Sequence, residues 1–235
     1  MSPQATTALR TPANADRVVA LRPDVVRPPS LVLNTDPAGS AAEAIRALRT
    51  DLMAQHFQTG RRALTICGAS AGVGCSFVAS NLALALAQIG MRTLLVDANL
   101  RNPTLDSVFG VTGRTLGLAD CLAAEGAEFG SYVQAEVQPN LSIIYAGGVP
   151  VNPQELLAGR RFHDLLEFCL REFEATLLDA PPANICADAR RISSVTGYTL
   201  IVTRRDLTYV DDVKALATQL AADRAFVVGC VLNEL

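Results

Sequence analysis

A glycine-rich segment between an apolar run and a helical stretch has the layout of a phosphate-binding loop. Residues 69–76 read ASAGVGCS, and Gly72 and Gly74 would let main-chain N–H groups converge on an anion at the positive end of a helix dipole. On the pattern G-x-x-x-x-G-K-[ST], Ser76 supplies the Mg²⁺-binding hydroxyl, and Cys75 stands where a lysine would reach the β- and γ-phosphates. A plain glycine turn between a strand and a helix looks similar. The expected loop comprises Ser70, Ala71, Gly72, Val73, Gly74, Cys75, Ser76 and Phe77.

Two aspartates, Asp97 and Asp179, each end an apolar run. Open α/β sheets place ligands beyond the carboxyl ends of their strands, so we expect both carboxylates beside the loop. There one carboxylate can hold Mg²⁺, directly or through water, while another orients or deprotonates an attacking hydroxyl. A helix cap or a loop hydrogen bond is the ordinary alternative for either residue. The predicted metal ligands are Ser76, Asp97 and Asp179.

Short apolar runs that alternate with helical segments would position these residues. The runs are continuous rather than alternating, which indicates strands buried on both faces, and so a mostly parallel sheet between helices. The fold prediction is a three-layer α/β sandwich of the P-loop NTPase type. The expected strands span 63–67, 93–97, 141–146, 175–180, 198–202 and 225–233. The expected helices after the loop span 75–90, 154–173 and 208–223.

An earlier helix is predicted over about 39–57, capped by Ser40 with Glu43 three residues later. Its predicted buried stripe consists of Ala44, Leu48, Leu52 and Met53. Residues 1–30 are rich in Pro, Ala, Thr and Arg, which predicts a flexible tail before a single domain over 31–235.

Composition narrows the class of protein further. A net charge of −3 and a pI near 5.4 give no sign of a nucleic-acid-binding protein. The 6 cysteines occur singly and there are only 2 histidines, which makes a zinc site an unattractive reading and favours reduced thiols in a reducing cytosol. We find no signal-peptide pattern and no apolar run near the ~18 residues of a membrane span. The expectation is a cytoplasmic protein that reaches the membrane only through a partner.

From about residue 31 onward the sequence resembles the cytoplasmic domain of bacterial tyrosine autokinases of capsule and exopolysaccharide operons. These belong to the larger class that includes the Min- and Par-type positioning ATPases. The resemblance extends over ~200 residues and rests on several separate motifs in order. The matching segments are EAIRALRTDL, SNLALALAQIGMRTLLVDANLRNPTLDSVFG, AGGVPVNPQELL, LLDAPP and VVGCVLN.

The resemblance implies ATP or ADP with Mg²⁺ as cofactor, and it implies roles for several residues. Asn233 would lie near the nucleotide base, and Asp188 takes a downstream acidic position. Glu43, Arg46 and Arg49 match an E-x-x-R-x-x-R helix that would meet a neighbouring subunit in a homo-oligomer. For Arg46 and Arg49 a solvated helix face paired with Glu43 is the alternative. The implied partner is the cytoplasmic end of a membrane polysaccharide co-polymerase, or chain-length regulator.

Three departures from the family pattern argue against efficient autophosphorylation. Cys75 replaces the loop lysine, Asn99 replaces the second acidic residue of D-x-D, and the chain ends at LNEL without a tyrosine-rich tail. Arg101 is a candidate to reach the nucleotide in compensation, so the predicted catalytic residues are Asp97, Asp179 and Arg101. The tyrosines present are scattered: Tyr132, Tyr145, Tyr198 and Tyr209.

Three functional hypotheses remain open at this point. The leading one is a regulator of polysaccharide synthesis or export with impaired kinase activity. The second is an active autokinase that uses a surrogate arginine, and the third is a Min- or Par-type positioning ATPase, disfavoured because the loop lacks an early lysine.

A thiol at a helix N-terminus would have a lowered pKa, which makes Cys75 a candidate reactive cysteine. A space-filling thiol is the alternative.

Overall fold

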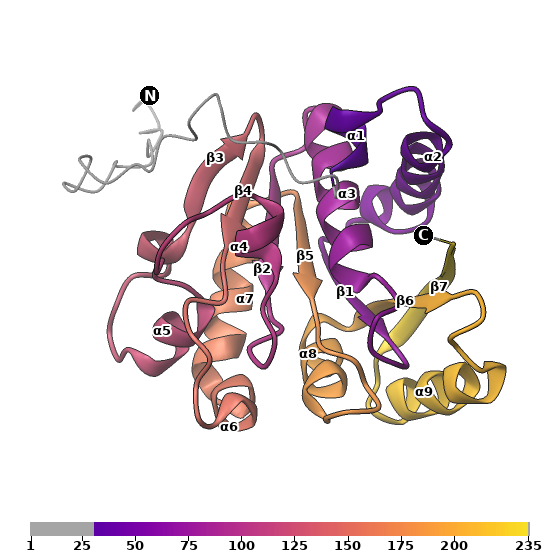
Figure 1. Cartoon of the computed structure of the whole chain (residues 1–235). Coiled ribbons are helices and arrows are strands. Elements are labelled where there is room, and N and C mark those ends of the chain that lie inside the picture. Colours follow the sequence, from indigo (N-terminus) through magenta and orange to yellow (C-terminus); the bar gives the residue numbers. More distant parts are fainter. Residues whose placement is uncertain (1–30, 235) are drawn as a thin grey trace, which may run out of the picture.

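The computed structural model describes residues 31–234, so the predicted tail over 1–30 lies outside the described residues. A seven-stranded sheet in the order β3-β4-β2-β5-β1-β6-β7 forms its centre (Figure 1). All neighbouring strands run parallel except β3, which is antiparallel to β4. The strands are β1 (Ala63–Gly68), β2 (Thr93–Asp97), β3 (Gln134–Gln138), β4 (Leu141–Ile144), β5 (Ala175–Asp179), β6 (Tyr198–Arg204) and β7 (Phe226–Asn233).

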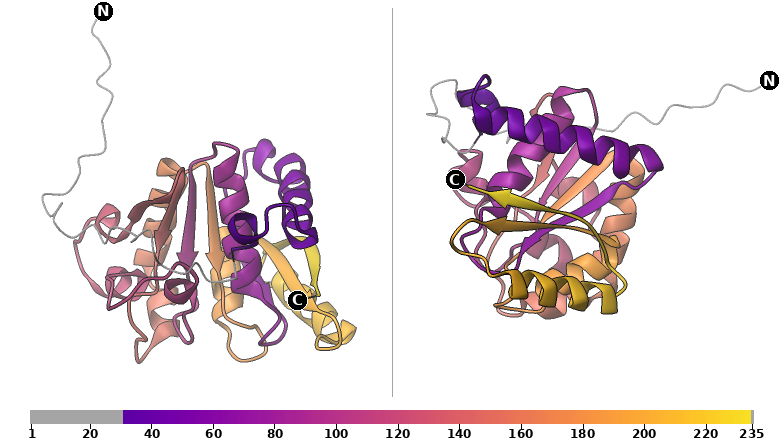
Figure 2. Two further views of the ribbon diagram at one scale, coloured as in Figure 1. Left: turned by 45° about the horizontal axis from the view of Figure 1, so that its top comes forward. Right: turned by 90° about the vertical axis from the view of Figure 1, so that its right-hand side faces the viewer.

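Helices cover both faces of this sheet. One face carries α1 (Val32–Thr35), α2 (Ser40–Gln55), α3 (Cys75–Gln88) and α4 (Leu105–Val108). The other face carries α5 (Leu118–Ala123), α6 (Pro153–Ala158), α7 (Arg160–Glu172), α8 (Asp188–Thr196) and α9 (Val210–Ala222). Short 3₁₀ turns lie at η2 (Phe57–Thr59) and η3 (Phe129–Tyr132). In the right-hand view of Figure 2 the sheet is seen between α2 above and α9 below.

The alternation of side chains along the strands produces two apolar cores, one for each face. In β2, Leu95 packs into the core under α3, whereas Leu94 and Val96 pack into the core on the side of α7. Strands β1, β2, β4 and β5 are buried along their whole length. This confirms the prediction of a mostly parallel sheet with helices on both faces, since continuous apolar strands need two covered faces.

Two details of the predicted helix over 39–57 are wrong. Gly39 rather than Ser40 takes the N-cap position, and no side chain caps this helix. Of the predicted stripe, Leu52 is buried and Leu48 and Met53 pack partly buried against the core, but Ala44 is exposed. Ala42 and Ile45 take its place in the buried face.

Other differences concern elements with weak sequence patterns. The helix expected over 154–173 is divided by Gly159 into α6 and α7. The strand expected over 141–146 ends at Ile144. The prediction omitted α5, α8 and the antiparallel edge strand β3, whose residues are mostly polar or half-exposed.

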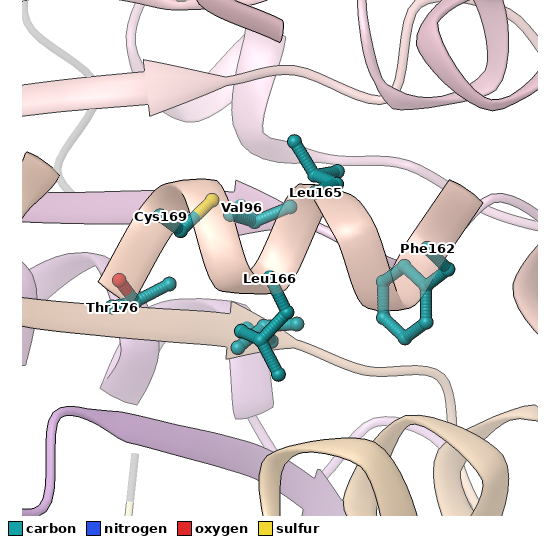
Figure 3. Close-up of a pocket in the computed structure, with 7 residues that line it drawn as sticks. Val96, Phe162, Leu165, Leu166, Cys169 and Thr176 are labelled. Atoms are coloured by element: carbon teal, nitrogen blue, oxygen red, sulfur yellow. The ribbon is translucent and has the colours of Figure 1, made fainter. Parts of the chain in front are cut away.

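A small cavity separates α7 from strands β2 and β5 (Figure 3). Its volume is ≈ 10 Å³, room for about one water, and its lining is apolar apart from Thr176. This cavity is a packing defect of the core rather than a ligand site. Within residues 31–234, no helix has the length and apolar character needed to cross a bilayer.

Candidate functional site

The glycine loop connects β1 directly to α3, as the sequence predicted. Gly72 and Gly74 have positive φ angles of 76° and 90°, a conformation that glycine adopts without strain. At the end of β1, a Cβ on Gly68 would lie 2.4 Å from Cγ2 of Val73, so this position also needs glycine. Val73 is buried and holds the loop against the strand.

The remaining loop residues divide into exposed and inward-facing positions. Ala71 is exposed at the loop tip, and Phe77 packs its partly buried ring against the core under α3. The hydroxyl oxygen of Ser70 is buried without a hydrogen-bond partner in the described structure. The first N–H groups of α3 lack intrahelical partners, as at every helix start, and the macrodipole makes them attractive to an anion.

Asp97 and Asp179 are direct neighbours across two adjacent strands. They are paired in the parallel register of β2 and β5, and Asp179 is in turn paired with Ile66 of β1. Adjacent strands lie about 4.8 Å apart, so both carboxylates sit beside the start of the glycine loop. Both are buried, with Asp97 0% and Asp179 1% exposed. The sequence prediction that these two residues meet at one edge of the sheet agrees with this arrangement.

Asp97 is held by main-chain amides. Its Oδ2 accepts from the N–H groups of Thr104 and Leu105 at 3.2 and 3.1 Å, and its Oδ1 accepts from Asn99 N at 3.2 Å. Burial raises the pKa of Asp97 to about 7, although these three amides act in the opposite direction. Its carboxylate therefore orders the turn that follows β2 and begins α4.

Asp179 lacks the main-chain donors that hold Asp97. Both of its carboxylate oxygens are buried without a hydrogen-bond partner among residues 31–234. Burial and the neighbouring Asp97 raise the pKa of Asp179 well above its ordinary value, while the nearby Ser76 hydroxyl lowers it. A buried carboxylate pair with one unsatisfied member has a strong affinity for a cation.

Ser76 connects the loop to the turn after β2. Its Oγ accepts a hydrogen bond of 2.9 Å from Oγ1 of Thr104, whose N–H also binds Asp97. Asn99, where the family pattern has an acidic residue, accepts from the N–H of Asn102 at 3.2 Å. Asn99 thus stabilises the turn through its amide oxygen. Thr104 was not predicted as a site residue, since a lone threonine after a turn gives no sequence signal.

The expectation of a lowered pKa for Cys75 is wrong. The thiol is turned toward the strand, with Sγ 3.2 Å from the position that a Cβ on Gly68 would occupy. Burial, followed by the charge of Asp179, raises the pKa of Cys75 well above its ordinary value. The helix dipole that would favour a thiolate is weaker than these two effects, so Cys75 fills space as a neutral thiol. All 6 cysteines are unpaired, and Cys67, Cys121 and Cys169 are buried.

Arg101 is bound to Asp188 rather than directed at the loop. Its Nε and Nη2 donate to the two carboxylate oxygens of Asp188 at 2.7 and 3.2 Å. Asp188 begins α8 and is 1% exposed, so the ion pair ties the turn after β2 to this helix. Both residues were singled out from the sequence, but their pairing was not.

Two side chains at the ends of β6 and β7 bind carbonyl oxygens of the loop. Nδ2 of Asn233, at the end of β7, donates to the carbonyl oxygen of Val73 at 2.9 Å. Nη1 of Arg204, at the end of β6, donates to the carbonyl oxygen of Gly72 at 3.1 Å. Arg204 was not predicted as a site residue. The signal that could have found it is its position at the carboxyl end of a buried strand beside β1.

The predicted subunit-contact residues are engaged within the chain. Nη1 of Arg46 binds Oε1 of Glu43 at 2.9 Å on the surface of α2. Nη1 of Arg49 donates to the carbonyl oxygen of Ala85 at 3.4 Å and links α2 to α3. In the single chain, Arg46 therefore matches the alternative of a solvent-exposed helix face on which it pairs with Glu43.

The residues around the loop fit a magnesium nucleotide. Among residues 31–234, three buried oxygens, one on Ser70 and two on Asp179, have no hydrogen-bond partner, and the loop amides belong to a helix N-terminus. Within residues 31–234 no cluster of three or more His, Cys, Asp or Glu side chains could hold a metal by itself. Mg²⁺ usually needs only one or two carboxylates, with phosphate and water completing its shell, so a site of Asp97, Asp179 and Ser76 meets that requirement.

Comparisons with known proteins give a consistent assignment, although no protein-family model matches. The chain is 33% identical over 226 residues to a putative tyrosine-protein kinase in the cps region of Klebsiella pneumoniae, covering 94% of this chain and 31% of that protein. It is 33% identical over 198 residues to the tyrosine-protein kinase etk of Escherichia coli strain K12, covering 84% and 27%. The chain therefore spans less than a third of the length of these relatives.

Solved structures match along most of their own length. The kinase domain of the Escherichia coli tyrosine kinase ETK superposes with a TM-score of 0.82 at 32% identity, covering 87% of this chain and 79% of that one. The septum site-determining protein MinD of Pyrococcus horikoshii, solved with Mg-ADP, superposes at 0.64 with 23% identity and 73% of this chain, which shows a common fold.

Proposed function

The chain belongs to the family of bacterial tyrosine-protein kinase domains, and from this premise we propose that it binds a magnesium nucleotide at the loop of residues 70–77 and transfers phosphate poorly. In this role the chain regulates polysaccharide synthesis or export as a kinase-like subunit. The observation that carries the proposal is the buried pair of Asp97 and Asp179 beside a loop whose lysine is replaced by a neutral thiol.

The two carboxylates have different tasks in this proposal. Asp179, with unsatisfied oxygens, is the group that holds the metal, and the Ser76 hydroxyl assists it. Asp97, fixed by three amides, is the group that orients the attacking hydroxyl and takes up its proton. Bound Mg²⁺ would neutralise negative charge on the phosphates.

Cys75 weakens the step that needs positive charge most. Charge develops on the phosphoryl oxygens and the leaving group during transfer, and a loop cation stabilises it. A neutral thiol turned toward the strand cannot do so. Binding depends more on the loop amides and the metal, which remain, so we expect binding to survive better than turnover.

Incubation of the purified chain with Mg-ATP, followed by detection of phosphotyrosine, tests the impaired activity. The expected wild-type signal is weak, and Cys75→Lys should increase it at least tenfold because the loop regains its cation. Calorimetric titration with Mg-ATP should show binding to both proteins. A strong wild-type signal that Asp97→Ala abolishes would show an efficient autokinase and overturn the proposal.

The proposed location and partners follow from the same family. We infer a cytoplasmic domain that docks on the inner end of a membrane co-polymerase and assembles with copies of itself through Glu43, Arg46 and Arg49. Sedimentation of the wild type and of Arg46→Ala with Arg49→Ala checks the assembly. A monomer in both samples at high concentration, with and without Mg-ATP, would contradict it.

A further inference from the structure

We propose that Arg204 supplies for nucleotide binding, though not for phosphate transfer, the positive charge that Cys75 removes from the phosphate loop, so that its guanidinium pairs with the terminal phosphate of a bound nucleoside triphosphate. This inference rests on the proposed nucleotide binding and adds a residue to that site. The cation would come from the end of β6, whereas the loop itself follows β1.

The fold brings Arg204 to the loop tip. Strand β6 pairs with β1 in a register that sets Val202 opposite Gly68, so Arg204 follows two residues beyond the point where the loop leaves the strand. Its Nη1 already donates to the carbonyl oxygen of Gly72 at 3.1 Å. The turn after β6 also approaches the loop, because Cδ2 of Leu207 lies 3.8 Å from where a Cβ on Gly72 would stand.

The backbone of Arg204 is fixed while its side chain is exposed. Arg204 is paired with Asn233 in β7, and its N–H donates to Oγ1 of Thr208 at 3.0 Å. Its carbonyl oxygen accepts from the N–H of Thr208 at 3.0 Å. A guanidinium on such an anchor can leave a carbonyl for a phosphate oxygen without any change of the main chain.

The charge of Arg204 is also uncommitted, in contrast to its neighbours. Arg101 is bound through two hydrogen bonds to the buried Asp188, and Arg205 is paired with Glu234. None of the ion pairs formed within residues 31–234 includes Arg204. A carbonyl oxygen satisfies only one donor of a guanidinium, which has five and matches the geometry of phosphate.

Titration of mant-ATP and mant-ADP with Mg²⁺ into the purified chain tests this role. Arg204→Ala should weaken the binding of mant-ATP at least tenfold and that of mant-ADP less than threefold, because only the triphosphate carries the terminal phosphate. Arg204→Lys should recover part of the loss. Arg205→Ala is the matched control, since it removes the adjacent exposed arginine, and its affinities should stay within twofold of the wild type.

A second comparison separates a charge that substitutes for lysine from a residue that only shapes the loop. In a Cys75→Lys background the loop has its own cation, so Arg204→Ala should then weaken the binding of mant-ATP less than threefold. An equal loss in both backgrounds, or an Arg204→Ala protein that binds ATP like the wild type, overturns the inference alone. A wild type that binds neither nucleotide at millimolar concentration overturns the proposed function as well.

Discussion

Asp179→Asn is expected to stabilise the protein in the absence of nucleotide and metal. The substitution keeps the size of the side chain and removes a buried negative charge whose two oxygens have no partner within the described structure. It also removes the repulsion with Asp97, which contributes to the raised pKa of Asp179. A site built for a cation is unstable while the cation is missing.

The size of the effect follows from two opposing terms. An uncompensated buried charge costs about 3–5 kcal/mol, whereas an asparagine amide left without partners costs about 1–3 kcal/mol. The difference is a gain of about 2 kcal/mol, which for a chain of this length raises Tm by about 4–8 °C.

The gain should depend on pH with a definite sign. A carboxyl whose folded pKa is raised binds its proton more tightly in the folded state, so stability is lost as pH rises from the ordinary value toward the folded one. For Asp97 that window runs from 3.8 to about 7, and Asp179 shifts in the same direction. The advantage of Asp179→Asn should therefore be larger at pH 8 than at pH 5, and it should vanish only below the ordinary carboxyl pKa of 3.8.

Urea unfolding followed by circular dichroism at pH 8 and pH 5 measures this difference. Asp51→Asn is the matched control, because it removes an exposed carboxylate from α2 and should change stability by less than about 0.5 kcal/mol at either pH. Mg-ATP at saturating concentration should stabilise the wild type and not the variant. An Asp179→Asn protein less stable than the wild type at pH 8 without metal would refute the account of an unsatisfied carboxylate.

Three further predictions concern the surroundings of the loop. Gly68→Ala should lower the free energy of unfolding by about 2 kcal/mol, because its Cβ would lie 2.4 Å from Cγ2 of Val73. Gly148→Ala is the control, since its Cβ would enter open space and should change Tm little. Equal Tm values for the two variants would contradict this packing. Arg101→Ala should lower the free energy of unfolding in urea by about 2 kcal/mol, because it leaves the Asp188 carboxylate buried and unpaired. The double variant Arg101→Ala with Asp188→Asn should recover most of this loss. An Arg101→Ala protein as stable as the wild type would contradict the role of the ion pair. Cys75 should react with iodoacetamide at pH 8 more slowly than free cysteine, as followed by mass spectrometry, and faster labelling would restore the reactive-thiol hypothesis.

The sequence identifies the strands and the glycine loop well because their signals are strong and local. Runs such as TLLVD and ATLLD are buried on both faces and contain few residues that favour another conformation. Parallel strands bring their carboxyl ends to one edge, so the meeting of Asp97 with Asp179 also follows from the chain alone. Strand β3 gives no such pattern, since its residues are polar and its bulged pairing with β4 lacks a regular register.

Contacts between distant segments are what the sequence does not reveal. Nothing in the local pattern of Arg101 says that its partner is Asp188, because 87 positions separate them. The contact of Arg204 with Gly72 spans 132 positions and depends on which strand lies beside β1. For Cys75, the motif predicts a thiol within a dipole, whereas burial beside a carboxylate dominates its pKa. Long-range packing therefore decides the chemistry at positions that the motif only locates.

The sheet order has a consequence for how the chain assembles during synthesis. Strand β1 lies between β5 and β6, and neither exists until the whole segment over 93–173 has left the ribosome. At about 5–20 residues per second, that delay lasts several seconds. Throughout it the apolar residues of β1 have no neighbouring strand, so a slow codon stretch or a truncated message ahead of β5 would expose them to chaperones and to aggregation.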